Sequence, residues 1–170
     1  MLIFQAIDDQ IILKWGSYPP DLDLHLAIFD ICEVSRGNMF CDGAFLDRNG
    51  PGSEIITIEN YHNTTYMAYV NCCYGNCANS DIIIDIIPEG YDSITVNYPT
   101  DQDTGYHLWL IGCFNGSTEG SNEGLNNIKI ANVLLEDIPY CPDDWSQCEK
   151  ICNTYSTNQN IDYDDDYLLN

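Results

Sequence analysis

The chain has 170 residues, of which 27 are acidic, 5 are basic and 9 are cysteine, and its formal net charge at pH 7 is −22. Because so negative a protein repels phosphates, nucleic acid is excluded as a partner, and no apolar run is long enough to span a membrane. This cysteine content is typical of disulfide-bonded proteins in oxidising compartments, so we expect the chain on the cell surface or outside the cell.

The first nine residues form an apolar segment that ends in two aspartates. Residues 2–7 are predicted as a short strand, separated by Asp8-Asp9 from the strands that follow. One alternative is that this segment is the first strand of its own sandwich. The other is a donor strand that pairs with the open edge of a neighbouring copy, because main-chain hydrogen bonds favour strand addition. The apolar residues that would make this strand exchange are Leu2, Ile3, Phe4 and Ile7.

Residues 10–138 alternate apolar and polar side chains with a period of two, and Gly, Asn, Asp and Pro interrupt the pattern. This is typical of β-strands joined by turns. About nine strands at this spacing predict an all-β fold, an immunoglobulin-like two-layer β-sandwich. The expected strands are, in chain order, residues 10–15, 22–31, a short pair or a bend within 40–46, 54–59, 65–73, 81–87, 93–98, 106–114 and 128–135.

The composition changes from residue 139 onward. Pro142 and the acidic residues after it predict a short helix that carries Cys148 and Cys152 one turn apart. Residues 153–170 are polar and contain the acidic run 162–166, so we expect an acidic tail. The predicted organisation is an N-terminal strand (1–9), a sandwich (10–138), and a Cys-containing helix with an acidic tail (139–170).

All nine cysteines are candidates for disulfides. Cys32 and Cys41 flank a Gly-containing bend and fit a hairpin disulfide. The adjacent Cys72 and Cys73 point to opposite faces of a strand, so they should take different partners. We expect those partners to be Cys77 and Cys113, and we expect Cys141 to pair with Cys148 or Cys152. Because nine is odd, one thiol is free or bonds another subunit.

Five residues form a candidate metal site. Asp21, Asp23 and His25 share one face of a predicted strand, because side chains alternate along a strand. Asp47 and Glu54 flank a later loop that would fold over that face. Clustered carboxylates suit Ca²⁺, which takes oxygen ligands in flexible geometry, so the sequence predicts a structural Ca²⁺ ion. The alternatives are a solvated polar face without an ion, or aspartates that cap the Pro-Pro turn.

Two sequons, Asn63-Thr64-Thr65 and Asn115-Gly116-Ser117, are candidate glycosylation sites on surface loops of a secreted protein. The sequence has no nucleophile elbow, phosphate-binding fingerprint or Cys-x-x-Cys zinc spacing. With so many acidic residues, a pair of carboxylates is weak evidence for glycoside hydrolysis. We therefore expect that the protein is not an enzyme.

Two stretches carry a resemblance to a known family. Leu13-Lys14-Trp15-Gly16 is followed by Asp21-Leu22-Asp23-Leu24-His25-Leu26, and Leu46-Asp47 is followed by Gly50-Pro51 and then Glu54. Over residues 10–137 the chain resembles the YfaP-like family of secreted and surface β-domains. It departs from the family pattern at Gly52-Ser53, which stand between the Gly-Pro pair and Glu54. The resemblance implies an immunoglobulin-like sandwich on a cell surface or in an extracellular assembly, and no particular chemistry.

These observations favour a non-enzymatic extracellular structural protein, a subunit that assembles with copies of itself into a pilus-like filament. The alternative is a Ca²⁺-dependent adhesion or carbohydrate-binding module, whose tyrosines would stack on glycans. Because each copy carries a charge of −22, copies repel one another at low salt. We therefore expect divalent cations or moderate salt to promote any assembly.

Overall fold

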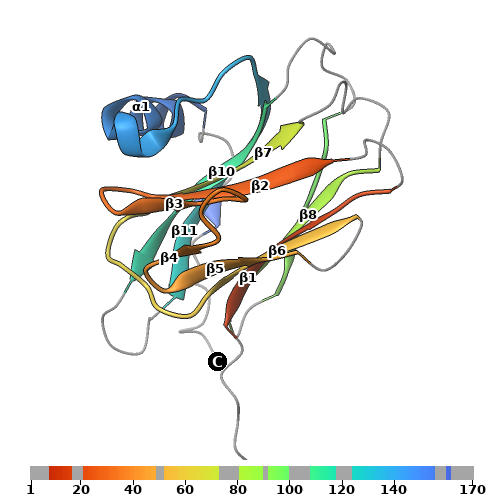
Figure 1. Ribbon diagram of the computed structural model, residues 1–170, viewed down its shortest axis with the longest axis horizontal. Coiled ribbons are helices and arrows are strands. Elements are labelled where there is room, and N and C mark those ends of the chain that lie inside the picture. Colours follow the sequence, from red (N-terminus) through yellow and green to blue (C-terminus); the bar gives the residue numbers. More distant parts are fainter. Residues whose placement is uncertain are drawn as a thin grey trace, which may run out of the picture.

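Two antiparallel sheets pack face to face in the computed structural model, which describes residues 8–16, 21–48, 52–72, 81–89, 92–99, 108–117, 124–155 and 160–161 (Figure 1). The predicted two-layer β-sandwich with a short C-terminal helix is confirmed. The predicted strand 2–7 and the acidic run 162–166 lie outside the described residues.

Each sheet has six strands within the described part of the chain. What we name sheet A has the order β4 (Phe40–Cys41), β5 (Ala44–Asp47), β6 (Ser53–Ile58), β1 (Asp9–Lys14), β8 (Ile83–Ile87) and β9 (Ile94–Asn97). Sheet B has the order β12 (Asn160–Ile161), β11 (Gly124–Leu135), β10 (Leu108–Ser117), β7 (Thr65–Cys72), β2 (Leu22–Ile28) and β3 (Cys32–Val34). The chain therefore crosses between the sheets several times.

The main core lies between the two sheets. Alternate residues of each strand point inward, as in β2, where Leu22, Leu24 and Leu26 are all fully buried. Trp109 of β10 is also fully buried in this core and donates its indole N–H to Asn132 Oδ1 at 2.8 Å. This alternation of apolar and polar residues is the pattern from which the sandwich was predicted.

A second core lies on the outer face of sheet B, under the C-terminal helix. The short 3₁₀ helix (Cys141–Asp143) and α1 (Trp145–Tyr155) lie on the side of sheet B that faces away from sheet A (Figure 1). Met67 and Tyr69 of β7 are buried in this second core, while Tyr66 and Ala68 are buried in the first. Both faces of β7 are therefore covered, so this strand is central in the fold as well as in the sheet.

Several sequence-based boundaries were wrong. β2 ends at Ile28 and turns back into β3, because Asp30 adopts a left-handed backbone (φ 63°) and Ile31 donates its N–H to Ile28 O at 3.1 Å. β11 begins at residue 124 rather than 128. Residues 160–161, expected in the tail, pair as β12 with residues 128–129 of β11, because that edge offers unpaired main-chain groups.

β11 contains two bulges. Its pairing with β10 shifts register at two points, and an asparagine lies at each, Asn127 (φ 46°) and Asn132 (φ 48°). Asparagine tolerates this left-handed conformation better than most residues. A bulge bends a strand and interrupts its ladder, so the outer edge of β11 is irregular.

Candidate functional site

The five predicted metal ligands do not form one site. Asp21 accepts a hydrogen bond from Arg36 Nη1 at 2.9 Å, and Asp23 Oδ1 lies 4.0 Å from the same nitrogen. Asp47 is exposed at the end of β5. His25 contacts a different carboxylate, that of Glu33. The expected grouping of Asp21, Asp23 and His25 on one strand face is thus divided between separate partners.

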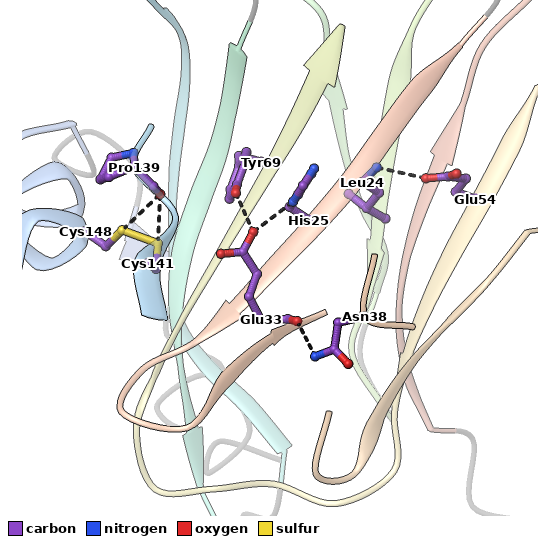
Figure 2. A network of polar contacts seen from close by, with 9 residues as sticks. All are labelled: Leu24, His25, Glu33, Asn38, Glu54, Tyr69, Pro139, Cys141 and Cys148. Carbon is purple, nitrogen blue, oxygen red and sulfur yellow. Dashed lines mark hydrogen bonds and ion pairs between the residues drawn. A yellow bond between two sulfur atoms is a disulfide. The ribbon is translucent and has the colours of Figure 1, made fainter. Parts of the chain in front are cut away.

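Glu54, the fifth of these residues, is buried and bridges the two sheets. Its Oε2 accepts the backbone N–H of Leu24 at 2.8 Å (Figure 2), and its Oε1 lies 3.4 Å from Arg48 Nε. β3 pairs with residues 26–28 of β2, so Leu24 lies beyond this pairing, and within the described residues no strand pairs with β2 there on that edge. Burial raises the pKa of Glu54 above its usual range, although the hydrogen bond from Leu24 opposes this. The carboxylate therefore acts as a main-chain acceptor for β2.

Arginines occupy the positions where a cation would be expected beside these carboxylates. Among the described residues there is no group of three or more His, Cys, Asp or Glu side chains arranged to hold a metal ion. The Ca²⁺ ion stays a prediction from the sequence.

His25, Glu33 and Tyr69 form a compact polar cluster on the outer face of sheet B (Figure 2). His25 Nδ1 lies 2.8 Å from Glu33 Oε1, and the Tyr69 hydroxyl donates a hydrogen bond to the same oxygen. The His25 and Tyr69 rings stack with centroids 4.6 Å apart. The three residues come from β2, β3 and β7, so the cluster links three neighbouring strands at one point.

This cluster is enclosed rather than open to a substrate. The Glu33 side chain is 1% exposed and that of His25 is 18% exposed. Burial, together with the charge of Glu33, raises the pKa of Tyr69 far above its usual range, so this hydroxyl keeps its proton. We infer that these side-chain contacts have a structural role and stabilise the pairing of the short β3 with β2.

A buried carboxylate that sequence reasoning did not single out joins the two sheets at the start of β1. Asp9 is 1% exposed. Its Oδ1 accepts the backbone N–H of Glu89, just after β8, and its Oδ2 accepts that of Leu125 in β11 at 3.1 Å. Burial raises the pKa of Asp9 to about 6, despite these two hydrogen bonds. The sequence signal was Asp8-Asp9 between apolar residues, which we interpreted only as an interruption.

Three disulfides lie within the described residues. Cys32–Cys41 joins β3 to β4, which confirms the predicted hairpin disulfide, and Cys141–Cys148 confirms one of the two predicted partners of Cys141. The predicted pairing of Cys113 with Cys72 or Cys73 is wrong, because Cys113 is bonded to Cys152 of α1. Cys113 points to the outer face of sheet B, where the helix packs.

Cys72 is also disulfide-bonded. Cys73 and Cys77 themselves lie outside the described residues, so their predicted roles are untested. Both predicted glycosylation sites have exposed side chains: Asn63 lies in the connection before β7, whereas Asn115 lies within β10 rather than in the expected loop.

The two sides of the sandwich differ. On one side the edge strands β3 and β4 are tied together by Cys32–Cys41. On the other side, β9 of sheet A faces β11 of sheet B across a groove of about 310 Å³. β9 contributes Ile94, Thr95, Val96 and Asn97 to this groove, and β11 contributes Ile130, Ala131 and Asn132.

This β9/β11 groove, as we name it, is uncharged in a strongly acidic protein. Val96 and Ile130 form its floor as members of the main core, while Thr95 and Asn97 are exposed. No strand pairs with the outer edge of β9 within the described residues. The sequence offered no direct signal for the groove, because which strands become edges depends on the sheet order.

Comparison with known proteins adds no relative: no family model, curated protein or solved structure matches this chain. In the part of the chain that the structure describes, no helix is both long and apolar enough to cross a membrane.

Proposed function

We propose that this protein is a non-enzymatic extracellular structural protein, a subunit of a surface filament built from identical copies. The observation that supports this most is the difference between the two sides of the sandwich. On one side Cys32–Cys41 ties the short edge strands β3 and β4 together, and the other side ends at the β9/β11 groove. A strand edge with free main-chain groups is a template for pairing with another chain. A contact between this edge and a different part of the next copy gives a fibre when the rotation does not close a ring.

The disulfides favour a location outside the cell. Four of them involve described cysteines, the three pairs above and the one at Cys72. Such bonds persist in oxidising compartments and are rare in the cytosol. Cys113–Cys152 spans 39 residues, and the chain-entropy model gives ~4 kcal/mol of stabilisation for a loop of that length. A subunit stabilised by these disulfides is suited to a cell surface, where it must stay folded for long periods.

The charge sets the conditions under which copies can associate. A net charge of −22 makes side-by-side packing repulsive, whereas the seven residues that line the β9/β11 groove carry no charge. At an ionic strength of about 0.15 M the Debye length is about 8 Å, so repulsion between distant carboxylates is largely screened. Assembly should therefore increase with salt and with divalent cations.

Electron microscopy and sedimentation velocity of the purified, oxidised full chain test this proposal. We expect monomers at an ionic strength of about 10 mM, where the Debye length is about 30 Å, and filaments at about 0.15 M or with Mg²⁺ or Ca²⁺. A protein that stays monomeric at every ionic strength and with both cations would contradict the proposal. The reduced protein, in which the Cys113–Cys152 bond between β10 and α1 is broken, is the control for assembly that requires the native fold.

A further inference from the structure

The exposed main-chain groups of β9 can be assigned from its pairing with β8. Tyr98 donates its N–H to Ile82 O at 3.1 Å, and Val96 and Ile94 continue the same register opposite Ile84 and Ile86. Main-chain groups alternate in direction along a strand. The N–H and C=O groups of Thr95 and Asn97 therefore point away from β8, toward the outer edge of sheet A.

The opposite wall of the groove is less suited to pairing. Residues 128–129 of β11 are already paired with β12, and Asn132 lies at a bulge with a left-handed backbone. A bulge interrupts a regular ladder. An added strand would therefore form its main-chain hydrogen bonds with β9 and pack its side chains against Ile130 and Ala131 of β11.

We propose that the β9/β11 groove is the acceptor for residues 2–7 of a second copy, which add to sheet A beside β9. This inference rests on the proposed function and names the two surfaces that meet in the filament. Residues 2–7 have the sequence Leu-Ile-Phe-Gln-Ala-Ile and carry no charged side chain. The residues that line the groove carry none either. Their alternation directs Leu2, Phe4 and Ala6 to one face of a strand, where they would cover the core floor.

The geometry of sheet A favours a second copy over the chain's own segment. β1 begins at Asp9, and the order β1-β8-β9 places the position outside β9 three strand spacings away. At about 4.8 Å per spacing this is about 14 Å, and an extended chain covers ~3.3 Å per residue. Four or five residues before Asp9 would be used for the crossing, so Gln5–Ile7 could not pair with their own β9. In a second copy the whole segment can pair.

Two full-length variants separate the donor from the acceptor. Ile3→Asp/Phe4→Asp places a charge on each face of the donor segment, so either orientation in an uncharged groove is disfavoured. Asn97→Pro removes an outward N–H of β9 without removing a hydrogen bond to β8, since proline is tolerated on edge strands. Asn97→Ala keeps the N–H and is the matched control. Circular dichroism and the thermal midpoint confirm that each variant is folded.

Sedimentation velocity at about 0.15 M ionic strength, where wild type is expected to polymerise, gives a distinct pattern for the variants. Ile3→Asp/Phe4→Asp, the donor variant, should be monomeric alone because only its acceptor groove still works. Asn97→Pro, the acceptor variant, should be monomeric alone because only its donor segment still works. An equimolar mixture should form dimers and nothing larger, because one donor and one acceptor remain. Asn97→Ala should polymerise like wild type.

Other outcomes overturn the inference in distinguishable ways. If wild type, Asn97→Pro and the donor variant all form filaments, the filament proposal stands and the proposed contact is wrong. If wild type is monomeric under every condition, the proposed function fails. Hydrogen exchange then identifies self-occupation: amides of Thr95 and Asn97 would be protected in the wild-type monomer and unprotected in the donor variant. A mixture that remains monomeric while wild type polymerises also contradicts the donor–acceptor pair.

Discussion

Replacing Asp9 by asparagine should change how stability depends on pH. Asp9 is buried between the sheets, and burial raises its pKa from 3.8 to about 6 in the folded protein. A carboxyl with a raised folded-state pKa binds its proton more tightly in the folded than in the unfolded state. Its contribution to stability is therefore fully present below pH 4, is lost between pH 4 and 6, and stays constant above that window.

The magnitude follows from the size of the shift. A change of about two pKa units at about 1.4 kcal/mol per unit corresponds to ~3 kcal/mol. The side-chain amide that Asp9→Asn introduces does not titrate and imitates the protonated carboxyl, with one acceptor oxygen for the N–H groups of Glu89 and Leu125. The free energy of unfolding of Asp9→Asn minus that of wild type should therefore increase by ~3 kcal/mol from pH 4 to pH 7.

Urea denaturation followed by tryptophan fluorescence at several pH values between 4 and 7 measures this difference. Comparing the two proteins at each pH cancels the effect of the many other carboxylates, including the raised pKa of Glu54. Glu136→Gln, at an exposed position, removes one charge without removing a buried contact and is the control. A wild-type-to-variant difference that does not change with pH, or that changes with the opposite sign, would refute the assignment of Asp9.

Three further predictions concern other parts of the molecule. Glu54→Ala should lower the free energy of unfolding by about 2 kcal/mol in urea denaturation, because it leaves the buried N–H of Leu24 without its acceptor. Gly112→Ala should lower it by about 1–3 kcal/mol, because a Cβ there would lie 2.3 Å from Lys129 O of β11. Ca²⁺ added at low ionic strength to the Ile3→Asp/Phe4→Asp variant, which should not assemble, should leave the thermal midpoint unchanged, because Arg36 already neutralises Asp21.

Each of these predictions has a control and an outcome that would contradict it. Arg48→Ala should cost less than about 1 kcal/mol, because this arginine is exposed, and a cost equal to that of Glu54→Ala would shift the role to the ion pair. Gly37→Ala, where the nearest atom is 3.9 Å away, should be close to neutral, so equal losses for both glycines would remove the steric argument. A thermal midpoint that rises with Ca²⁺ concentration would restore the site predicted from the sequence.

Much of the fold was predictable because alternation along strands reports burial directly. In β2, the leucines at positions 22, 24 and 26 face the core, as their spacing indicated. The turn at Asp30 was missed because the apolar residues on both sides of it continue the strand pattern. Local sequence carries little information on a single left-handed residue, although aspartate is one of the types that adopt it.

The interactions between distant segments were the part that could not be predicted. Cys113 was predicted as a partner of Cys72 or Cys73 because these adjacent cysteines need different partners, yet its side chain points to the outer face of sheet B, toward Cys152. The predicted ligands Asp21 and Glu54 took an arginine and a main-chain N–H as partners. Both outcomes depend on how the C-terminal helix and the two sheets pack, which periodicity does not encode.

Hydrogen exchange of the β9 amides before and after assembly tests the central claim most directly. We expect the outward amides of Thr95 and Asn97 to exchange rapidly in the monomer and to become protected in the filament, while the exposed Phe40 of β4, on the side where Cys32–Cys41 ties β3 to β4, is unchanged. Protection that appears at β4 and not at β9 would contradict the assignment of the open side of the sandwich as the assembly surface.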